Sequence, residues 1–158
     1  MSLSIPERPL SDFIPHRPPM LLIDRIHQYQ TDNLQAEVTI AEDSAFFEAA
    51  TQQVPNYVGI EYMAQTIAAL AGVEADARGE PLRIGFLLGS RKLQLLQPGF
   101  DLGHSYRISV TRLYQEDTGL AVFDCQIYDS AAQLVASANV NVFQPQDTDA
   151  YITGVAAH

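Results

Sequence analysis

The stretch NYVGIEYMAQTIAALAGVEADAR, residues 56–78, decides the fold expected for this chain. Its apolar residues recur at spacings of three and four, which predicts one long amphipathic helix. They form the stripe Ile60, Met63, Ala64, Ile67, Ala68 and Ala71. Asn56 is a suitable N-cap for this helix, and Gly79 is expected to end it. Because the remaining face is also rich in alanine, we expect the helix to be surrounded by other elements.

Strand patterns flank the helix on both sides in the sequence. Two are expected before it, and four follow it: they cover residues 20–29, 34–40, 83–96, 105–115, 120–129 and 134–144. Hydrophobic and polar residues alternate in these segments, and short polar turns join the last strands, which predicts antiparallel pairing. The economical architecture is an α+β fold in which an antiparallel sheet curls around one long central helix. The uncovered sheet edges favour a dimer in which the sheet continues across the interface.

The composition is that of a globular domain. We expect residues 1–158 to form a single domain, with a proline-rich lead-in at 1–19 and a loosely held tail at 145–158. The net charge of −10 repels nucleic-acid phosphates and anionic membranes, so neither is expected as a partner. Cys125 is the only cysteine, and no signal-like or membrane-spanning apolar run is apparent. These features predict a cytoplasmic protein.

Three stretches resemble the β-hydroxyacyl-(acyl carrier protein) dehydratases, which have the hotdog fold. They are IPHRPPMLLIDRI (14–26), VPNYVGIEYMAQ (54–65) and GSRKLQLLQPGFDLG (89–103). They occur in the family's order, and the resemblance spans residues 14 to 143. The string VGIEYMAQ is most similar to a divergent, dehydratase-like branch found in aryl-polyene type gene clusters. The resemblance implies a protein of fatty acid or polyketide type biosynthesis that dehydrates, or helps to dehydrate, 3-hydroxyacyl thioesters on acyl carrier protein.

The resemblance also assigns roles to residues on the helix. Glu61 matches the family's catalytic glutamate, and Gln65 matches the glutamine one turn later. Gly59 is expected to allow close backbone approach to the substrate. Tyr57 and Tyr62 flank Glu61 and are expected to narrow or cap an acyl tunnel. No cofactor is implied. Without the resemblance, Glu61 would be interpreted as a solvated acid in the first turn, where the helix dipole favours it.

The family's second catalytic group, a histidine fourteen residues before the glutamate, is absent. That position is Phe47, and an alternative alignment places Ala50 there. His16 matches a histidine of the family's N-terminal string and is expected to be a hydrogen-bonded structural residue. His104, which opens a strand, is a weaker candidate for a catalytic role. Two further histidines are expected at the surface: His27 and His158.

Three hypotheses about function remain open. The first is a dehydratase in which Glu61 is the surviving acid–base residue. The second is a non-catalytic subunit that pairs with a histidine-bearing paralogue, so the expected assembly is a homodimer or a heterodimer. The third is a hotdog thioesterase, whose helix acid activates water without a histidine. The acidic carrier protein is expected to dock on Arg83, Arg91 and Lys92. No residues have metal-ligand spacing on one element, so no metal is expected.

Overall fold

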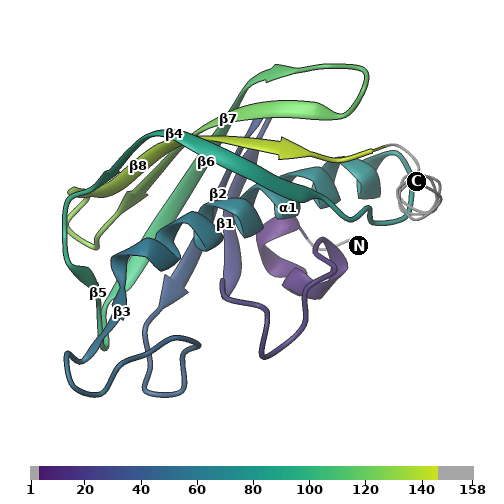
Figure 1. Ribbon diagram of the computed structural model, residues 1–158. Coiled ribbons are helices and arrows are strands. Elements are labelled where there is room, and N and C mark those ends of the chain that lie inside the picture. The colour runs from purple at the N-terminus through teal and green to yellow at the C-terminus, as the bar shows by residue number, and fades with distance from the viewer. Residues whose placement is uncertain (1–3, 146–158) are drawn as a thin grey trace, which may run out of the picture.

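The computed structural model describes residues 4–145, in which a six-stranded antiparallel sheet curls around one long helix (Figure 1). The strands of this sheet run in the spatial order β1-β2-β6-β7-β8-β4. Their bounds are β1 (Arg25–Gln30), β2 (Asn33–Thr39), β4 (Phe86–Leu95), β6 (Ser105–Gln115), β7 (Leu120–Tyr128) and β8 (Leu134–Phe143). All six expected strands are present, although the first begins five residues later than expected. The expected tail and His158 lie outside the described residues, apart from Pro145.

Smaller elements complete the fold and were not foreseen from the sequence. Two 3₁₀ turns, η1 (Ile5–Glu7) and η2 (Leu10–Asp12), precede the sheet, and a third, η3 (Asn56–Val58), leads into the long helix. A second sheet pairs β3 (Gln53–Pro55) with β5 (Gly99–Asp101). Each of these strands has three residues, which is too short for a periodicity signal.

The long helix, α1, spans Gly59–Ala77. Its predicted end is confirmed, because Gly79 has a φ of +69° just beyond it, a conformation that glycine adopts without a steric penalty. The predicted N-cap is wrong: Asn56 lies in η3, and its Nδ2 donates instead to the carbonyl oxygen of Gln97 at 2.9 Å. This bond ties the start of the helix to the chain just before β5.

The hydrophobic core lies between α1 and the concave face of the sheet. Alternate residues of β6 and β7 are buried there, as the sequence pattern predicted; they are Tyr106, Ile108, Val110, Ala121, Phe123, Cys125 and Ile127. On the helix side the fully buried apolar residues include Tyr62, Met63, Leu70 and Val73. Much of the predicted stripe behaves differently, since Ile60, Ala64, Ala68 and Ala71 are only half-buried. The two faces of α1 therefore have different neighbours.

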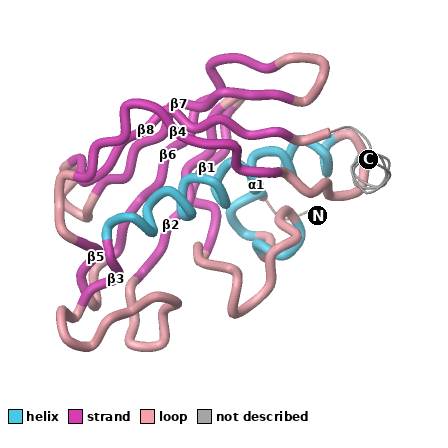
Figure 2. Tube along the Cα trace, in the orientation of Figure 1, coloured by secondary structure: helices cyan, strands magenta, loops and turns pink. Residues whose placement is uncertain are grey.

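The two edges of the large sheet also differ. The η1 turn packs beside β1, whereas in residues 4–145 no strand pairs with the outer edge of β4 (Figure 2). The β4 region also exposes leucines, among them Leu88 at 58% and Leu93 at 43%. An open edge with exposed apolar residues is a surface suited to strand association.

No helix within the described part of the chain is long and apolar enough to span a membrane.

Candidate functional site

A cavity of about 350 Å³ lies between α1 and the ends of four strands. Its helix side consists largely of small residues, Ala64, Ala68 and Ala71, together with Ile67. Its sheet side is also largely apolar and includes Ile84, Phe86, Leu87, Ala121, Phe123 and Val142. The space exists because alanines stand where leucines would fill the gap between helix and sheet. Four of the six residues of the predicted stripe therefore line the cavity.

Glu61 lines this cavity and is the first of the lining residues along α1. It shares a face of α1 with Gln65 and Ala68, because residues four and seven apart lie on the same side of a helix. Its position in the first turn of α1 favours a negative charge near the helix N-terminus. The residue itself is solvent-exposed in the single chain. The carboxylate therefore stands beside a largely apolar cavity and is itself open to solvent.

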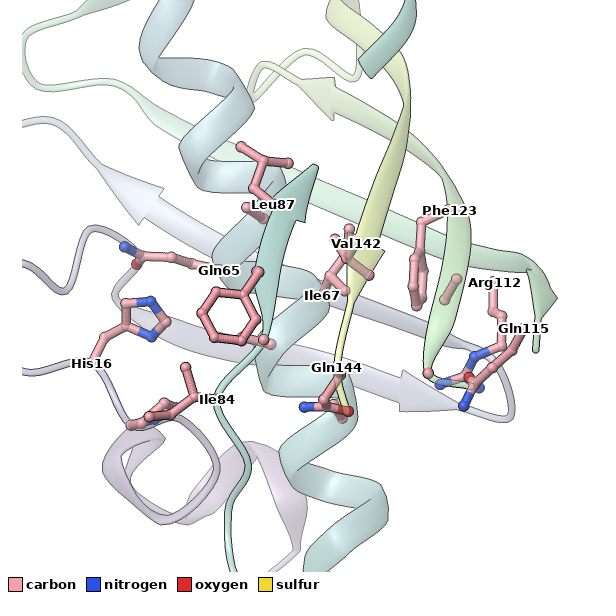
Figure 3. A pocket seen from close by; sticks show the side chains of 18 of the residues that line it. His16, Gln65, Ile67, Ile84, Leu87, Arg112, Gln115, Phe123, Val142 and Gln144 are labelled. Carbon is pink, nitrogen blue, oxygen red and sulfur yellow. The ribbon is translucent and has the colours of Figure 1, made fainter. Parts of the chain in front are cut away.

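His16, which Figure 3 shows on the same side of the cavity as Gln65, lines the same cavity as Glu61. Its Nδ1 atom is sealed from solvent and has no hydrogen-bond partner in residues 4–145. Burial lowers the pKa of His16 below its ordinary value of 6.5, and the nearby negative charge of Glu61 only partly opposes this shift. The hydrogen bond expected for this histidine is therefore absent at Nδ1 within the described residues. The structure brings an imidazole into the cavity of the glutamate, although from the N-terminal segment.

Hydrogen bonds hold the segment that carries His16. The Arg17 guanidinium donates to the carbonyl oxygens of Ile14 at 2.6 Å and His16 at 2.8 Å. The Gln65 side chain accepts from the Leu22 amide at 2.8 Å and donates to the Met20 carbonyl at 2.8 Å. Gln65 lines the cavity as well, and its amide oxygen and nitrogen each make one of these bonds. Its observed role is to fasten the N-terminal segment to α1.

A glycine on α1 brings this segment closer still. A Cβ atom placed on Gly72 would lie 1.6 Å from the Phe13 carbonyl oxygen. Only a residue without a side chain therefore permits this contact. Arg8 adds an ion pair with Asp76 at 2.7 Å, near the end of the helix. The segment that positions His16 thus follows α1 closely.

Three of the expected substrate-binding residues do not line the cavity. Tyr62 is buried in the core, where its ring meets Phe100 edge to face at 5.2 Å between centroids. Gly59 also faces Phe100, since a Cβ there would be 3.2 Å from its ring. Tyr57 is 64% exposed, outside the cavity. Each helical residue turns the direction of its side chain by about 100°, so neighbours of Glu61 in sequence face elsewhere.

The other end of the cavity is polar. Arg112, Gln115 and Gln144 line it, on the side away from His16 and Gln65 (Figure 3). Arg112 donates to both carboxylate oxygens of Glu74, at 2.8 and 2.6 Å, and to Asp32 at 2.6 Å. Burial opposes the charge, but these two carboxylates outweigh it, and the pKa of Arg112 is raised. Sequence reasoning missed this arginine, although it continues the inward alternation of Tyr106, Ile108 and Val110 along β6.

The expected carrier-docking residues lie in different surroundings. Arg91 and Lys92 are exposed on β4 and make no ion pair with any described residue. Arg83 is instead paired with Glu80 at 2.8 Å. His27 is also paired, its Nδ1 lying 3.0 Å from Glu37, and His104 is exposed. Neither of these two histidines lines the cavity.

Comparisons with known proteins agree with this architecture. A solved chain of the dehydratase heterocomplex ApeI:P from Xenorhabdus doucetiae is similar at 25% identity and a TM-score of 0.83, over 92% of this chain and 97% of that chain. The PaaI protein of the phenylacetic acid degradation operon of E. coli is similar at 14% identity and a TM-score of 0.59, over 75% and 80% of the two chains. The smu.793 protein of Streptococcus mutans UA159, solved with acetyl CoA, is similar at 13% identity and a TM-score of 0.58, over 75% and 86%.

The fold and the family follow from these likenesses. The similar structures confirm the expected hotdog fold, an antiparallel sheet around one long helix. The family model described as ApeP-like, ApeP dehydratase, matches residues 8–153, which is nearly the whole chain. This chain therefore belongs to the ApeP-like dehydratase family.

Proposed function

We propose that this protein acts in the dehydration of 3-hydroxyacyl chains that acyl carrier protein presents as thioesters, in biosynthesis of the aryl-polyene type. The observation that carries the proposal is the presence of Glu61 among the lining residues of a largely apolar cavity. The cavity follows α1 from Glu61 to Ala71, a rise of about 15 Å. A carboxylate beside an apolar channel of this length suits an acyl chain whose reacting carbons lie at the channel's end.

The chemistry requires one group that can take and return a proton. Dehydration breaks a C–H bond at the α-carbon and the C–O bond at the β-carbon, forms a double bond between them and releases water. A positioned carboxyl group can serve as a general acid or base in such a step. Glu61 is the carboxylate that the family resemblance and the cavity both favour. We expect the reaction to take place in the cytoplasm, where the buried free thiol of Cys125 would stay reduced.

The test is the substitution Glu61→Gln, which keeps the size of the side chain but removes its acid–base function. Purified protein is assayed with a 3-hydroxyacyl thioester of pantetheine, and the unsaturated product is measured. We expect at least about a 10²-fold loss of rate with an unchanged melting temperature, because Glu61 is exposed. Glu42→Gln, at an exposed carboxylate outside the cavity, serves as the matched control. A Glu61→Gln variant with full activity would exclude Glu61 from the reaction.

A second candidate function, a subunit of a two-protein dehydratase, is favoured by the open edge of β4. The ApeI:P protein of X. doucetiae is a heterocomplex, and we extend this arrangement to the present chain. A dehydratase paralogue that pairs with β4 would extend the sheet and cover the leucines exposed near that edge. It would also bring further groups, including a histidine, toward the exposed Glu61. Arg91 and Lys92 on the same strand would then lie near the new interface, where an acidic carrier protein can dock.

The partner is tested by changing one exposed leucine on β4. Leu88→Glu places a charge on the open edge, so we expect it to abolish association with the paralogue, as followed by light scattering. Leu113→Glu changes a leucine of nearly equal exposure on β6 and is expected to leave association intact. Self-association that Leu88→Glu abolishes would identify a homodimer instead. Association that survives Leu88→Glu would exclude β4 as the interface.

A further inference from the structure

The two ring nitrogens of His16 lie in different environments. Its Nδ1 is buried without any partner in the described part of the chain, whereas Nε2 is not among the buried unpaired atoms. The residue lines the cavity that also receives Glu61. No hydrogen bond joins the two side chains, and both border the same cavity of about 350 Å³, which is open to a bound molecule.

The burial of Nδ1 decides which nitrogen carries the proton. A neutral imidazole has one N–H donor and one acceptor. A proton on Nδ1 would leave a buried donor unpaired, at a cost of about 1–3 kcal/mol, and unpaired buried N–H groups are rarer than unpaired acceptors. A proton on Nε2 instead places the donor where a ligand or water can accept it. His16 is neutral near pH 7, since burial lowers its pKa. It therefore presents an N–H donor.

We propose that His16 is a second residue of the Glu61 site, with its Nε2–H donating to the carbonyl oxygen of the bound thioester. The proposal rests on the proposed function and names a group that supports the same reaction. A donor at this oxygen stabilises the negative charge that develops there when the α-proton leaves. The role differs from that of a catalytic base, so it does not replace the histidine that is absent from the position of Phe47.

The two residues together account for every proton in the reaction. The Glu61 carboxylate takes the α-proton, and the electron pair of that C–H bond moves onto the carbonyl oxygen held by His16. The resulting enolate then re-forms its carbonyl, the double bond forms between the α- and β-carbons, and the C–O bond at the β-carbon breaks. The departing oxygen takes the proton from Glu61 and leaves as water. Glu61 returns to its carboxylate form, and His16 keeps its proton throughout.

The test compares substitutions that keep or remove a donor at the position of Nε2. The Gln side chain can place an amide N–H near that position, whereas Asn is one methylene shorter and Ala has no donor. The full chain, alone and in its complex with a dehydratase paralogue, is assayed with a 3-hydroxyacyl pantetheine thioester. We expect His16→Ala and His16→Asn to lower kcat by about 10²-fold with little change in KM, and His16→Gln to recover most of the rate. His104→Ala is the control for an exposed histidine outside the cavity.

Nitrogen NMR of the unliganded protein gives a readout that does not depend on turnover. We expect the neutral His16 ring to carry its proton on Nε2, and a proton on Nδ1 would overturn the inference. Full activity of His16→Ala, in a protein that Glu61→Gln inactivates, would overturn the inference and leave the proposed function intact. Full activity of Glu61→Gln, or no turnover in any assembly, would remove the proposed function and this inference with it.

Discussion

The two faces of α1 use similar small and apolar residues for different purposes. On the sheet-facing side Met63, Ala69 and Leu70 are completely buried, so their side chains pack against other residues. The cavity-facing side carries Ala64 and Ala68, which are half-buried and border an open space. The difference arises from both sides of the gap, because the alanines of α1 are too short to fill the space that separates them from the ends of β4, β7 and β8. One helix therefore provides both the core of the fold and the wall of a channel.

Truncation on the sheet-facing side should produce the largest effect on stability. Met63→Ala removes a fully buried side chain, so we expect the free energy of unfolding to fall by about 2–5 kcal/mol. Denaturant unfolding measures this change. Leu113→Ala, which truncates an exposed leucine, should change the free energy of unfolding by less than about 0.5 kcal/mol. Equal losses in the two variants would contradict the position of the core.

Replacing each of two adjacent alanines by leucine should give different effects on the two faces of α1. Ala69 is fully buried, so Ala69→Leu should overpack the core and cost about 1–3 kcal/mol. Ala68 borders the cavity, so Ala68→Leu should fill empty space and change stability by less than about 1 kcal/mol. The same variant should lower kcat/KM for long 3-hydroxyacyl thioesters by about tenfold or more and leave short ones little affected. Equal losses for short and long chains would show that the cavity does not hold the acyl chain.

The pH dependence of stability should show a smaller effect at the cavity. The pKa of His16 is lower in the folded protein than its ordinary value of 6.5, because burial opposes the charged form. As the pH falls below about 6.5, the unfolded chain binds a proton more readily than the folded one, so the His16 contribution reduces stability. At higher pH the two states do not differ at this residue.

Thermal unfolding between pH 5 and pH 8 measures this contribution. His16→Gln should remove part of the loss of stability at acid pH. His27→Gln, which removes an imidazole that does not line the cavity, is the control and should not remove this part of the loss. A His16→Gln variant with the same pH profile as the parent protein would show that His16 is not shielded in solution.

Most of the fold, but little of the site, could be predicted from the sequence. The alternation of residues in β6 and β7 specifies which side chains are buried, and the glycine after the helix marks its end, because these signals depend on local geometry. The short strands β3 and β5 carry too few residues for such a signal. The position of Asn56 depends on a contact with Gln97, which lies forty-one residues away, and local capping preference does not reveal it.

The residues that line the site could not be predicted in the same way, because they depend on how elements distant in sequence are oriented relative to one another. Glu61 could be identified from its family string, but its neighbours Tyr57, Gly59 and Tyr62 were placed by proximity in sequence, and helical rotation turns them away. His16 lies forty-five residues before Glu61 and reaches the cavity only because the N-terminal segment folds back along α1. Arg112 could have been found, since its place in the alternation of β6 already indicated an inward-facing charge.

The close contact between Gly72 and Phe13 implies that the channel cannot be assembled from the helix and sheet alone. A shortened protein that begins after residue 13 would keep Glu61, all the strands and the alanine wall. It would nevertheless lose the backbone that rests on Gly72 and the ion pair of Arg8, two of the contacts that hold the segment of His16 against α1. The segment before β1, as far as the structure describes it from residue 4 onward, is therefore part of the wall of the cavity through Pro15 and His16.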